Sequence, residues 1–397
     1  RGKPIGTPKA LIGAVLLVVA FFQSSLAFAQ SSLPCRIAGS GGLYCLTEDT
    51  TAFPLDTRTP LILIRGIDLA GSHLPPPTLE DLQGYWSNFL SVFYATSELK
   101  QKYKVYHFSY SNNDVSVFEL GGILRDVLDK QNIIEASFGN KPIVILSHSM
   151  GGLIARSFMQ QHWQTTGRFA GTQGGERVDK LITLATLHRG TPLANNPNGS
   201  LTLKTDNANF ALYVFKKVAG SDPPSYNQVN TSDLRWDNED SLLDYDQFGD
   251  ERNDWLLSNL NSNSTYDHKI VAYAGEITPD PSYILVDPYI GGAILLNEIF
   301  GYPDDQLSSD GVVPTRSAWF EGHNVLRGYY RLFQDHNHTE MVSGNGNGTL
   351  FARLTLDLAP VTWITKPLSN VKSGDLLTLS WQIVGGTTFG GHTNVHY

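Results

Sequence analysis

Short apolar runs alternate along the chain with longer segments in which apolar residues recur every three or four positions. The runs have the length and the Ile- and Val-rich composition of strands buried on both faces of a parallel sheet. Buried strands are predicted at about 61–65, 104–109, 142–147, 180–185, 269–274 and 328–334. Helices are predicted at about 84–100, 115–137 and 150–163. This alternation predicts an α/β fold with a doubly wound, mostly parallel sheet that binds ligands at the carboxyl ends of its strands.

Two long excursions interrupt this alternation, and excursions of such length inside a domain are usually functional or disordered. The first, 191–266, is polar and rich in Asn, Ser and Asp. We expect it to form a cap-like insertion beside the site, with an apolar face supplied by Phe210, Tyr213, Val214 and Phe215. The second, 277–307, contains the apolar segment YIGGAILLNEIF. That segment either lines an apolar pocket or packs as an ordinary core helix.

The pattern changes again at both ends of the chain. From 360 to 397 it becomes alternating strands separated by Ser-Gly-Asp and Gly-Gly turns, which is typical of a β-sandwich. The segment is too short to close a sandwich, so we expect a partial β module with unpaired edges or a hairpin packed on the main domain. At the other end, basic residues precede the apolar run ALIGAVLLVVAFF, and Ala27-Phe28-Ala29 supplies small residues for cleavage. We therefore expect 1–29 to be a secretory signal peptide, with an uncleaved membrane anchor as the alternative.

The net charge of the chain argues against one class of binding partner. The 397 residues carry a formal net charge of −9, which becomes −12 without 1–29, because that segment holds three basic and no acidic residues. Such a balance repels phosphate backbones and argues against nucleic-acid binding.

The two cysteines, Cys35 and Cys45, follow the expected cleavage site, and in an oxidising compartment they should form a disulfide rather than stay free. The acidic stretch 236–254 could hold calcium, but it lacks the regular ligand spacing of a calcium loop, so a solvated acidic face is favoured. Sequence alone does not decide whether calcium binds.

The segment KPIVILSHSMGGLIARSF, 141–158, places one serine between a predicted strand and a predicted helix. The turn is so short that residues two positions before and after Ser149 must be small, as Ser147 and Gly151 are. A serine at this junction either caps the helix with its side chain or presents a nucleophile.

The strand, serine and helix arrangement resembles the nucleophile turn of the α/β-hydrolases, whose usual form is G-x-S-x-G. S-H-S-M-G-G is most similar to the motif of secreted bacterial lipases and esterases, with Ser147 in place of the usual glycine. The resemblance implies an acid and then a histidine further along the chain. Asp310, in S-D-G-V-V-P, is similar to the acid turn of lipases, and His338, in H-T-E-M, is similar to their base loop.

Other residues compete for these two roles. Asp-Gly is also a common turn pair, so Asp310 has an ordinary turn interpretation, and Asp304 and Asp305 lie near it. His336 stands two residues before His338, but the H-x-x-M spacing of the family favours His338.

Two further histidines receive no catalytic role. His148 adjoins the nucleophile and is interpreted as a structural or pocket-lining side chain. H-R-G-T-P-L-A, 188–194, resembles the stretch that follows the next strand in many lipases. His188 and Arg189 either contact substrate or belong to a loop shaped by Gly190 and Pro192, and the second interpretation is favoured.

The resemblance also implies an oxyanion hole made of two backbone amides. One is expected from Met150, directly after the nucleophile, at the positive end of the helix. The other is expected from Ile67, in the loop after an earlier strand. Lipase-like chains usually have His-Gly in this loop, whereas this chain has Arg65-Gly66.

Taken together, these residues predict a secreted serine hydrolase, with residues 30–359 as its α/β-hydrolase domain. It would cleave ester or lipid substrates through an acyl-enzyme, with no cofactor and no metal, and transient contact with a lipid surface is compatible with it. An acyltransferase with the same intermediate and a noncatalytic surface-binding protein are the alternatives. Sequence alone does not set the acyl chain length, the alcohol or the oligomeric state.

Overall fold

A computed structural model gives the fold of the chain. It describes 35–38, 42–67, 77–110, 115–195, 232–237, 253–283, 287–300, 308–323, 325, 332–346, 348–359, and the backbone of 361–365, 376–383 and 390–396. The expected signal peptide, Asp304, Asp305 and the four residues proposed for the apolar face of the insertion lie outside the described residues. No helix in the described part is long and apolar enough to span a membrane.

An eight-stranded sheet forms the centre of the molecule, in the order β1-β2-β4-β3-β5-β6-β7-β8. Its six strands from β3 to β8 are parallel, as predicted, and β1 and β2 are antiparallel additions at one edge. The strands are β1 Cys35–Ala38, β2 Gly42–Glu48, β3 Thr59–Ile64, β4 Tyr103–Ser109, β5 Ile143–His148, β6 Val178–Leu184, β7 Ile270–Glu276 and β8 Leu332–Gln334.

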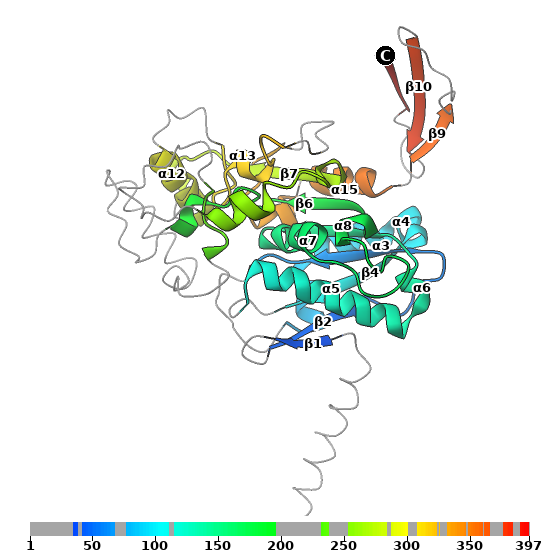
Figure 1. Ribbon diagram of the computed structural model, residues 1–397. Coiled ribbons are helices and arrows are strands. Elements are labelled where there is room, and N and C mark those ends of the chain that lie inside the picture. Colours follow the sequence, from blue (N-terminus) through cyan, green and yellow to red (C-terminus); the bar gives the residue numbers. More distant parts are fainter. Residues whose placement is uncertain are drawn as a thin grey trace, which may run out of the picture.

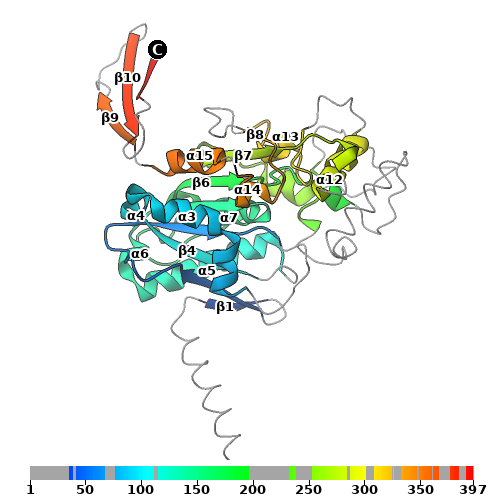
Figure 2. The same cartoon turned by 180° about the vertical axis from the view of Figure 1, so that it is seen from behind.

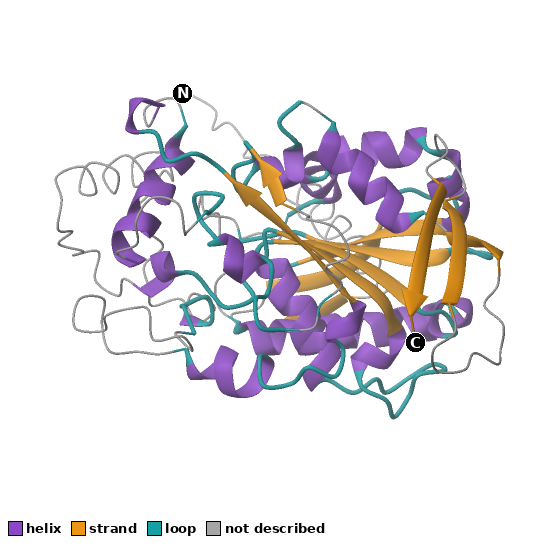
Figure 3. Cartoon of the chain, turned by 90° about the horizontal axis from the view of Figure 1, so that it is seen from above, coloured by secondary structure: helices purple, strands orange, loops and turns teal. Residues whose placement is uncertain are grey.

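Helices cover both faces of this twisted sheet (Figure 3). They are α2 Leu79–Tyr85, α3 Ser87–Ala95, α4 Ser97–Lys102, α5 Val117–Ile134, α6 Ala136–Gly139, α7 Met150–Gln161, α8 Gly174–Arg177, α12 Pro288–Phe300, α13 Thr315–Ala318, α14 Glu340–Ser343 and α15 Thr349–Leu358. Short helical turns of other types are η1 Pro192–Asn195, η2 Trp255–Leu260, η3 Asp267–Lys269 and η4 Pro281–Tyr283.

The alternation of side chains along each strand creates two hydrophobic cores. On β3, Ile62 and Ile64 face the core shared with α5 and α7, whereas Leu61 and Leu63 face the core shared with α3 and α15. Figure 1 shows α5 and α7 on one face, and Figure 2 shows α3, α14 and α15 from behind. The two-sided burial explains why these strands are continuous apolar runs.

Two features of the main domain differ from the sequence prediction. The helix expected at 84–100 is three helices, α2 to α4, because the backbone turns out of the helix at Trp86 and becomes extended at Thr96. The antiparallel hairpin of β1 and β2 was not predicted, because four residues of β1 are too few to carry a pattern.

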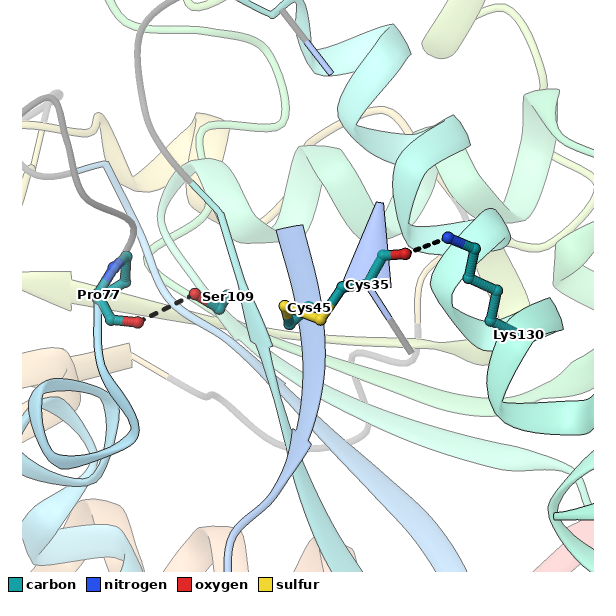
Figure 4. The surroundings of a disulfide bond; sticks show 5 residues. All are labelled: Cys35, Cys45, Pro77, Ser109 and Lys130. Atoms are coloured by element: carbon teal, nitrogen blue, oxygen red, sulfur yellow. Dashed lines mark hydrogen bonds between the residues drawn. A yellow bond between two sulfur atoms is a disulfide. The ribbon is translucent and has the colours of Figure 1, made fainter. Parts of the chain in front are cut away.

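The expected disulfide holds this hairpin together, because Cys35 and Cys45 are directly paired across β1 and β2. Figure 4 shows the disulfide with Lys130 of α5, which donates to the Cys35 carbonyl. On the other side of β2, Ser109 donates to the Pro77 carbonyl over 3.1 Å. The disulfide thus joins the two strands of the hairpin, and the pairing of β2 with β4 and the Lys130 contact attach the hairpin to the main domain.

The chain after 360 forms a separate antiparallel sheet in the order β11-β10-β9. Its strands are β9 Val361–Thr365, β10 Leu376–Ile383 and β11 Gly390–His396.

Candidate active site

The turn between β5 and α7 holds Ser149 in a left-handed backbone conformation, with φ 53° and ψ −130°. Such a conformation is unfavourable for a residue with a Cβ and is typical of a nucleophile on a sharp strand-to-helix turn. Ser149 occupies the N-cap position of α7, yet its side chain makes no capping hydrogen bond there. The capping interpretation of this serine is therefore wrong.

Small neighbours allow the turn, as predicted. Ser147 is fully buried and donates to the Ile182 carbonyl over 3.2 Å. A Cβ on Gly151 would lie 2.4 Å from the Arg65 carbonyl oxygen and 2.6 Å from that of Ile64. Since real Cβ atoms essentially never approach so closely, position 151 requires glycine where α7 crosses the end of β3.

Ser149, His338 and Asp310 meet at the carboxyl ends of the parallel strands. The Nε2 atom of His338 lies 3.0 Å from Ser149 Oγ, and its Nδ1 atom lies 2.8 Å from Asp310 Oδ2. The His338 amide also donates to the Asp310 carbonyl over 2.9 Å. All three residues are buried. The fold thus brings His338 into contact with side chains that are 189 and 28 positions away in sequence.

The carboxylate of Asp310 is oriented by its own turn. Its Oδ1 atom accepts from the amides of Val312 and Val313, over 2.9 and 2.7 Å, which leaves Oδ2 for His338. Gly311 provides the positive φ of 87° that this turn requires. Asp310 therefore forms an Asp-Gly turn and also contacts His338, so the two interpretations of this residue do not exclude each other.

His336, the competing histidine, points elsewhere. It is buried, and its Nδ1 atom lies near the Gln334 carbonyl and the Asn345 amide. Among the described residues, the histidine that contacts Ser149 is His338.

The loop after β3 lies directly against Ser149. A Cβ on Gly66 would come within 2.7 Å of the Ser149 Cβ. Ile67, the proposed oxyanion donor, follows at the next position and is half-buried. Within the described part of the chain, no hydrogen bond from the Ile67 or Met150 amide to a protein acceptor is found, so both donors are compatible with an oxyanion role.

Arg65, which replaces the usual histidine, shapes the backbone of this loop. It is buried, its guanidinium lies 4.7 Å from the centre of the Tyr110 ring, and it donates to the carbonyls of Gly66 and Tyr110. The Tyr110 hydroxyl in turn donates to the carbonyls of Arg65 and Gly66. No sequence motif marks Tyr110 for this role, and the residue is distinguished only by its place directly after the predicted strand 104–109.

Helix α12 supports both the acid loop and the base loop. A Cβ on Gly292 would lie 1.8 Å from the Gly311 carbonyl oxygen, so α12 passes directly over the acid turn. Asp287 accepts from Asn337 over 3.2 Å, and the Tyr289 hydroxyl bonds Thr339. The apolar segment of the second excursion thus contributes a helix beside the loops that carry Asp310 and His338.

His188 and Arg189 are fully engaged away from the three central residues. Arg189 forms a buried ion pair with Asp237 at 3.0 Å, and His188 lies between Thr183 and Arg156. Burial, with the neighbouring Arg156, lowers the pKa of His188 well below its usual value. A Cβ on Gly190 would meet the Arg235 carbonyl at 1.9 Å. These contacts agree with the structural role favoured for this stretch.

Within the residues that the structure describes, no group of three metal-ligating side chains is present. Most of the acidic stretch 236–254 lies outside them, so its solvated interpretation stays a prediction.

Residues 86–229, about a third of the chain, match the family model described as a PGAP1-like alpha/beta domain. The fold is α/β-hydrolase-like. This confirms the predicted fold class of the main domain and supports the α/β-hydrolase superfamily.

Three bacterial proteins are among the solved structures to which this chain is similar. A Bacillus licheniformis lipase, BlEst2, in its mature form, is 18% identical, covers 78% of this chain and 97% of its own, and has a TM-score of 0.46. A Listeria innocua gene product is 12% identical, with 75% and 92% covered and a TM-score of 0.36. Phospholipase PlaB from Legionella pneumophila is 16% identical, with 66% and 45% covered and a TM-score of 0.39. A search of curated proteins found no match.

Proposed function

We propose that the protein is an exported serine hydrolase that cleaves carboxylic esters through an acyl-enzyme intermediate. The observation that carries the proposal is the continuous hydrogen-bond chain from Ser149 Oγ through both ring nitrogens of His338 to Asp310 Oδ2. A serine hydroxyl becomes a useful nucleophile only when an oriented base takes its proton. The left-handed backbone of Ser149 is a second support.

In the first half of the reaction, Ser149 Oγ attacks the ester carbonyl carbon and its proton passes to Nε2 of His338. Asp310 accepts the Nδ1 proton in a hydrogen bond, which keeps the Nε2 lone pair toward Ser149 and stabilises the imidazolium. The amides of Ile67 and Met150 bind the negative charge on the former carbonyl oxygen. Collapse of this intermediate breaks the ester bond, and His338 returns the proton to the departing alcohol.

In the second half, His338 takes a proton from water as the water oxygen attacks the acyl carbon. The tetrahedral intermediate uses the same two amides. Its collapse breaks the bond to Ser149, His338 reprotonates Ser149 Oγ, and the carboxylic acid leaves.

Ser149→Ala should lower ester turnover by at least about 10³-fold, because the nucleophile is lost while the oxyanion donors remain. Asp310→Asn should lower kcat by a similar factor, because it disturbs the tautomer of His338. Turnover of p-nitrophenyl esters of increasing chain length, beside emulsified triglyceride, measures both effects and ranks the acyl chains.

Ser157→Ala is the matched control, since Ser157 lies about two helix turns further along α7 and its hydroxyl donates to Gln161. It should keep nearly full turnover. Full activity in Ser149→Ala would end the proposal. N-terminal sequencing of protein recovered from the culture medium tests export, and a mature chain starting at Gln30 is the expected result.

A further inference from the structure

A chain of polar groups connects the oxyanion loop to the base loop behind the nucleophile. The Gly66 amide donates to the Tyr85 hydroxyl over 3.1 Å. The Tyr85 hydroxyl lies 2.5 Å from His148 Nδ1, and His148 Nε2 lies 2.9 Å from the His338 carbonyl oxygen. The two ends of this chain belong to the two loops that must be placed correctly around Ser149.

The chemistry of the groups sets the direction of each hydrogen bond. The His338 carbonyl can only accept, so His148 carries its proton on Nε2. Burial, and next the neighbouring His338, lower the pKa of His148 well below its usual value, so the ring is neutral and Nδ1 holds a lone pair. The Tyr85 hydroxyl therefore donates to Nδ1, and its oxygen accepts from the Gly66 amide. Every donor in the chain faces an acceptor.

The same residues limit what can stand at position 66. A Cβ there would lie 3.0 Å from His148 Nδ1 and 3.2 Å from the Tyr85 oxygen, besides its contact with Ser149. Tyr85 is placed at this point as the last residue of α2, a helix whose start is held by a capping box between Thr78 and Asp81. Its neighbour Trp86 is buried, which anchors the end of α2 in the core.

We infer that Tyr85 and His148 are positioning residues, which hold the oxyanion loop and the catalytic histidine in their correct positions around Ser149. This inference rests on the proposed function. His148 holds the backbone of His338 through its carbonyl, whereas Asp310 holds it through its amide. Tyr85 fixes the peptide that precedes the Ile67 amide. A displacement of about 1 Å at either loop is enough to slow such a reaction roughly 10²-fold.

Three variants test the inference: Tyr85→Phe, His148→Leu and His148→Gln. Tyr85→Phe and His148→Leu should each lower kcat for a p-nitrophenyl ester by about 10- to 100-fold, with KM changed less than about threefold. The side-chain amide of a glutamine can again donate to the His338 carbonyl, so His148→Gln should recover most of the loss. The combined Tyr85→Phe/His148→Leu loss should fall short of the product of the single losses by at least about threefold, because the two side chains are in contact.

Tyr94→Phe is the matched control. It removes another partly buried tyrosine hydroxyl, which donates to Asp49 outside the site. It should leave kcat unchanged even where it lowers thermal stability.

Other outcomes overturn the inference. Unchanged kcat in Tyr85→Phe and His148→Leu, a change confined to KM, or losses that simply multiply would each do so. Equal loss in His148→Leu and His148→Gln would also count against it.

Long-range ¹H–¹⁵N NMR of His148 tests the chain of polar groups independently of the proposed ester hydrolysis. The inference requires a neutral His148 ring with its proton on Nε2 at about pH 7. A ring protonated on Nδ1 overturns it, whether or not the protein turns over esters. If wild-type protein hydrolyses no ester and Ser149 takes no phosphonate label while His148 shows the expected tautomer, the proposed function fails and the polar chain stands.

Discussion

Ser149 depends on two glycines for its position, Gly66 on one side and Gly151 on the other. At 151 the nearest atoms to an added Cβ are backbone oxygens of Ile64 and Arg65, which cannot rotate away. The clash can be relieved only if β3 or its following loop moves. Since that loop carries the proposed oxyanion amide of Ile67, the movement should reach the reaction as well as the stability.

Gly151→Ala should therefore lower the free energy of unfolding by about 1–3 kcal/mol and reduce kcat at the same time. Gly84→Ala is the matched control, because Gly84 is exposed in α2 and an added Cβ meets nothing within 4 Å. It should stabilise by up to about 1 kcal/mol through helix propensity, with kcat unchanged. Urea unfolding and ester turnover check both. A Gly151→Ala protein with wild-type turnover would contradict this account.

At the residue scale, local patterns of small or turn-forming neighbours were sufficient to select Ser149, Asp310 and His338, whose side chains the fold brings into hydrogen-bonding contact. Their catalytic roles stay a prediction. Their supporting residues could not be named in this way. Tyr85 reaches His148 across 63 positions, and Tyr110 reaches Arg65 across 45. Such pairs leave no periodic signal, and only the packing of separate elements brings them into contact.

At the scale of elements, a buried ion pair attaches the interior of the first excursion to the segment just before it. Arg189 and Asp237 are both nearly inaccessible, with side chains 5% and 1% exposed, and pair through two nitrogens of the guanidinium. Asp237 also accepts from Asn261, and its amide donates to the Arg189 carbonyl. A buried charge that loses its partner charge is costly, whereas an exposed pair contributes little.

Asp237→Asn should lower the free energy of unfolding by about 3–5 kcal/mol, because it leaves the Arg189 charge without its carboxylate. Glu321→Gln is the control. It removes the carboxylate partner of Arg316 in an ion pair whose side chains are 26% and 52% exposed, and should cost less than about 1 kcal/mol. Urea unfolding of both variants measures the difference. If both variants lower the free energy of unfolding by the same amount, burial of the Arg189–Asp237 pair does not increase its contribution to stability.

The elements that sequence predicted correctly are those buried on both faces. Continuous apolar runs marked β3 to β7, and the switch to helical spacing marked α7. The hairpin of β1 and β2 was not predicted, because it has no long apolar pattern. A disulfide and contacts with α5 stabilise it instead. The single helix predicted at 84–100 was wrong, because the backbone leaves the helical conformation at Trp86 and at Thr96.

For the whole molecule, one carboxyl group links the first excursion to the main domain in a pH-dependent way. Asp233 accepts from the Val117 amide over 2.7 Å, at the start of α5, where Glu119 also lies. Burial raises the pKa of Asp233 to about 6, and the negative charge of Glu119 acts in the same direction, while the Val117 amide opposes them. The folded chain therefore holds this proton more tightly than the unfolded chain, whose pKa is near the ordinary value of 3.8.

The sign follows from proton binding. Between about pH 4 and pH 6 the folded state binds more protons at Asp233 than the unfolded state, so this group makes the free energy of unfolding fall as pH rises. Asp233→Asn keeps an oxygen for the Val117 amide and removes the titration. Relative to wild type, the variant should gain on the order of 2 kcal/mol of stability between pH 4 and pH 7. Asp280→Asn is the control, since the Ser282 hydroxyl lowers the pKa of exposed Asp280 from its ordinary value of 3.8, so that this group titrates below the pH range tested and should give little slope within it. Urea unfolding across this pH range measures how the free energy of unfolding of both variants changes with pH. If the difference in stability between wild type and Asp233→Asn does not change with pH, protonation of Asp233 does not affect the contact between the excursion and α5.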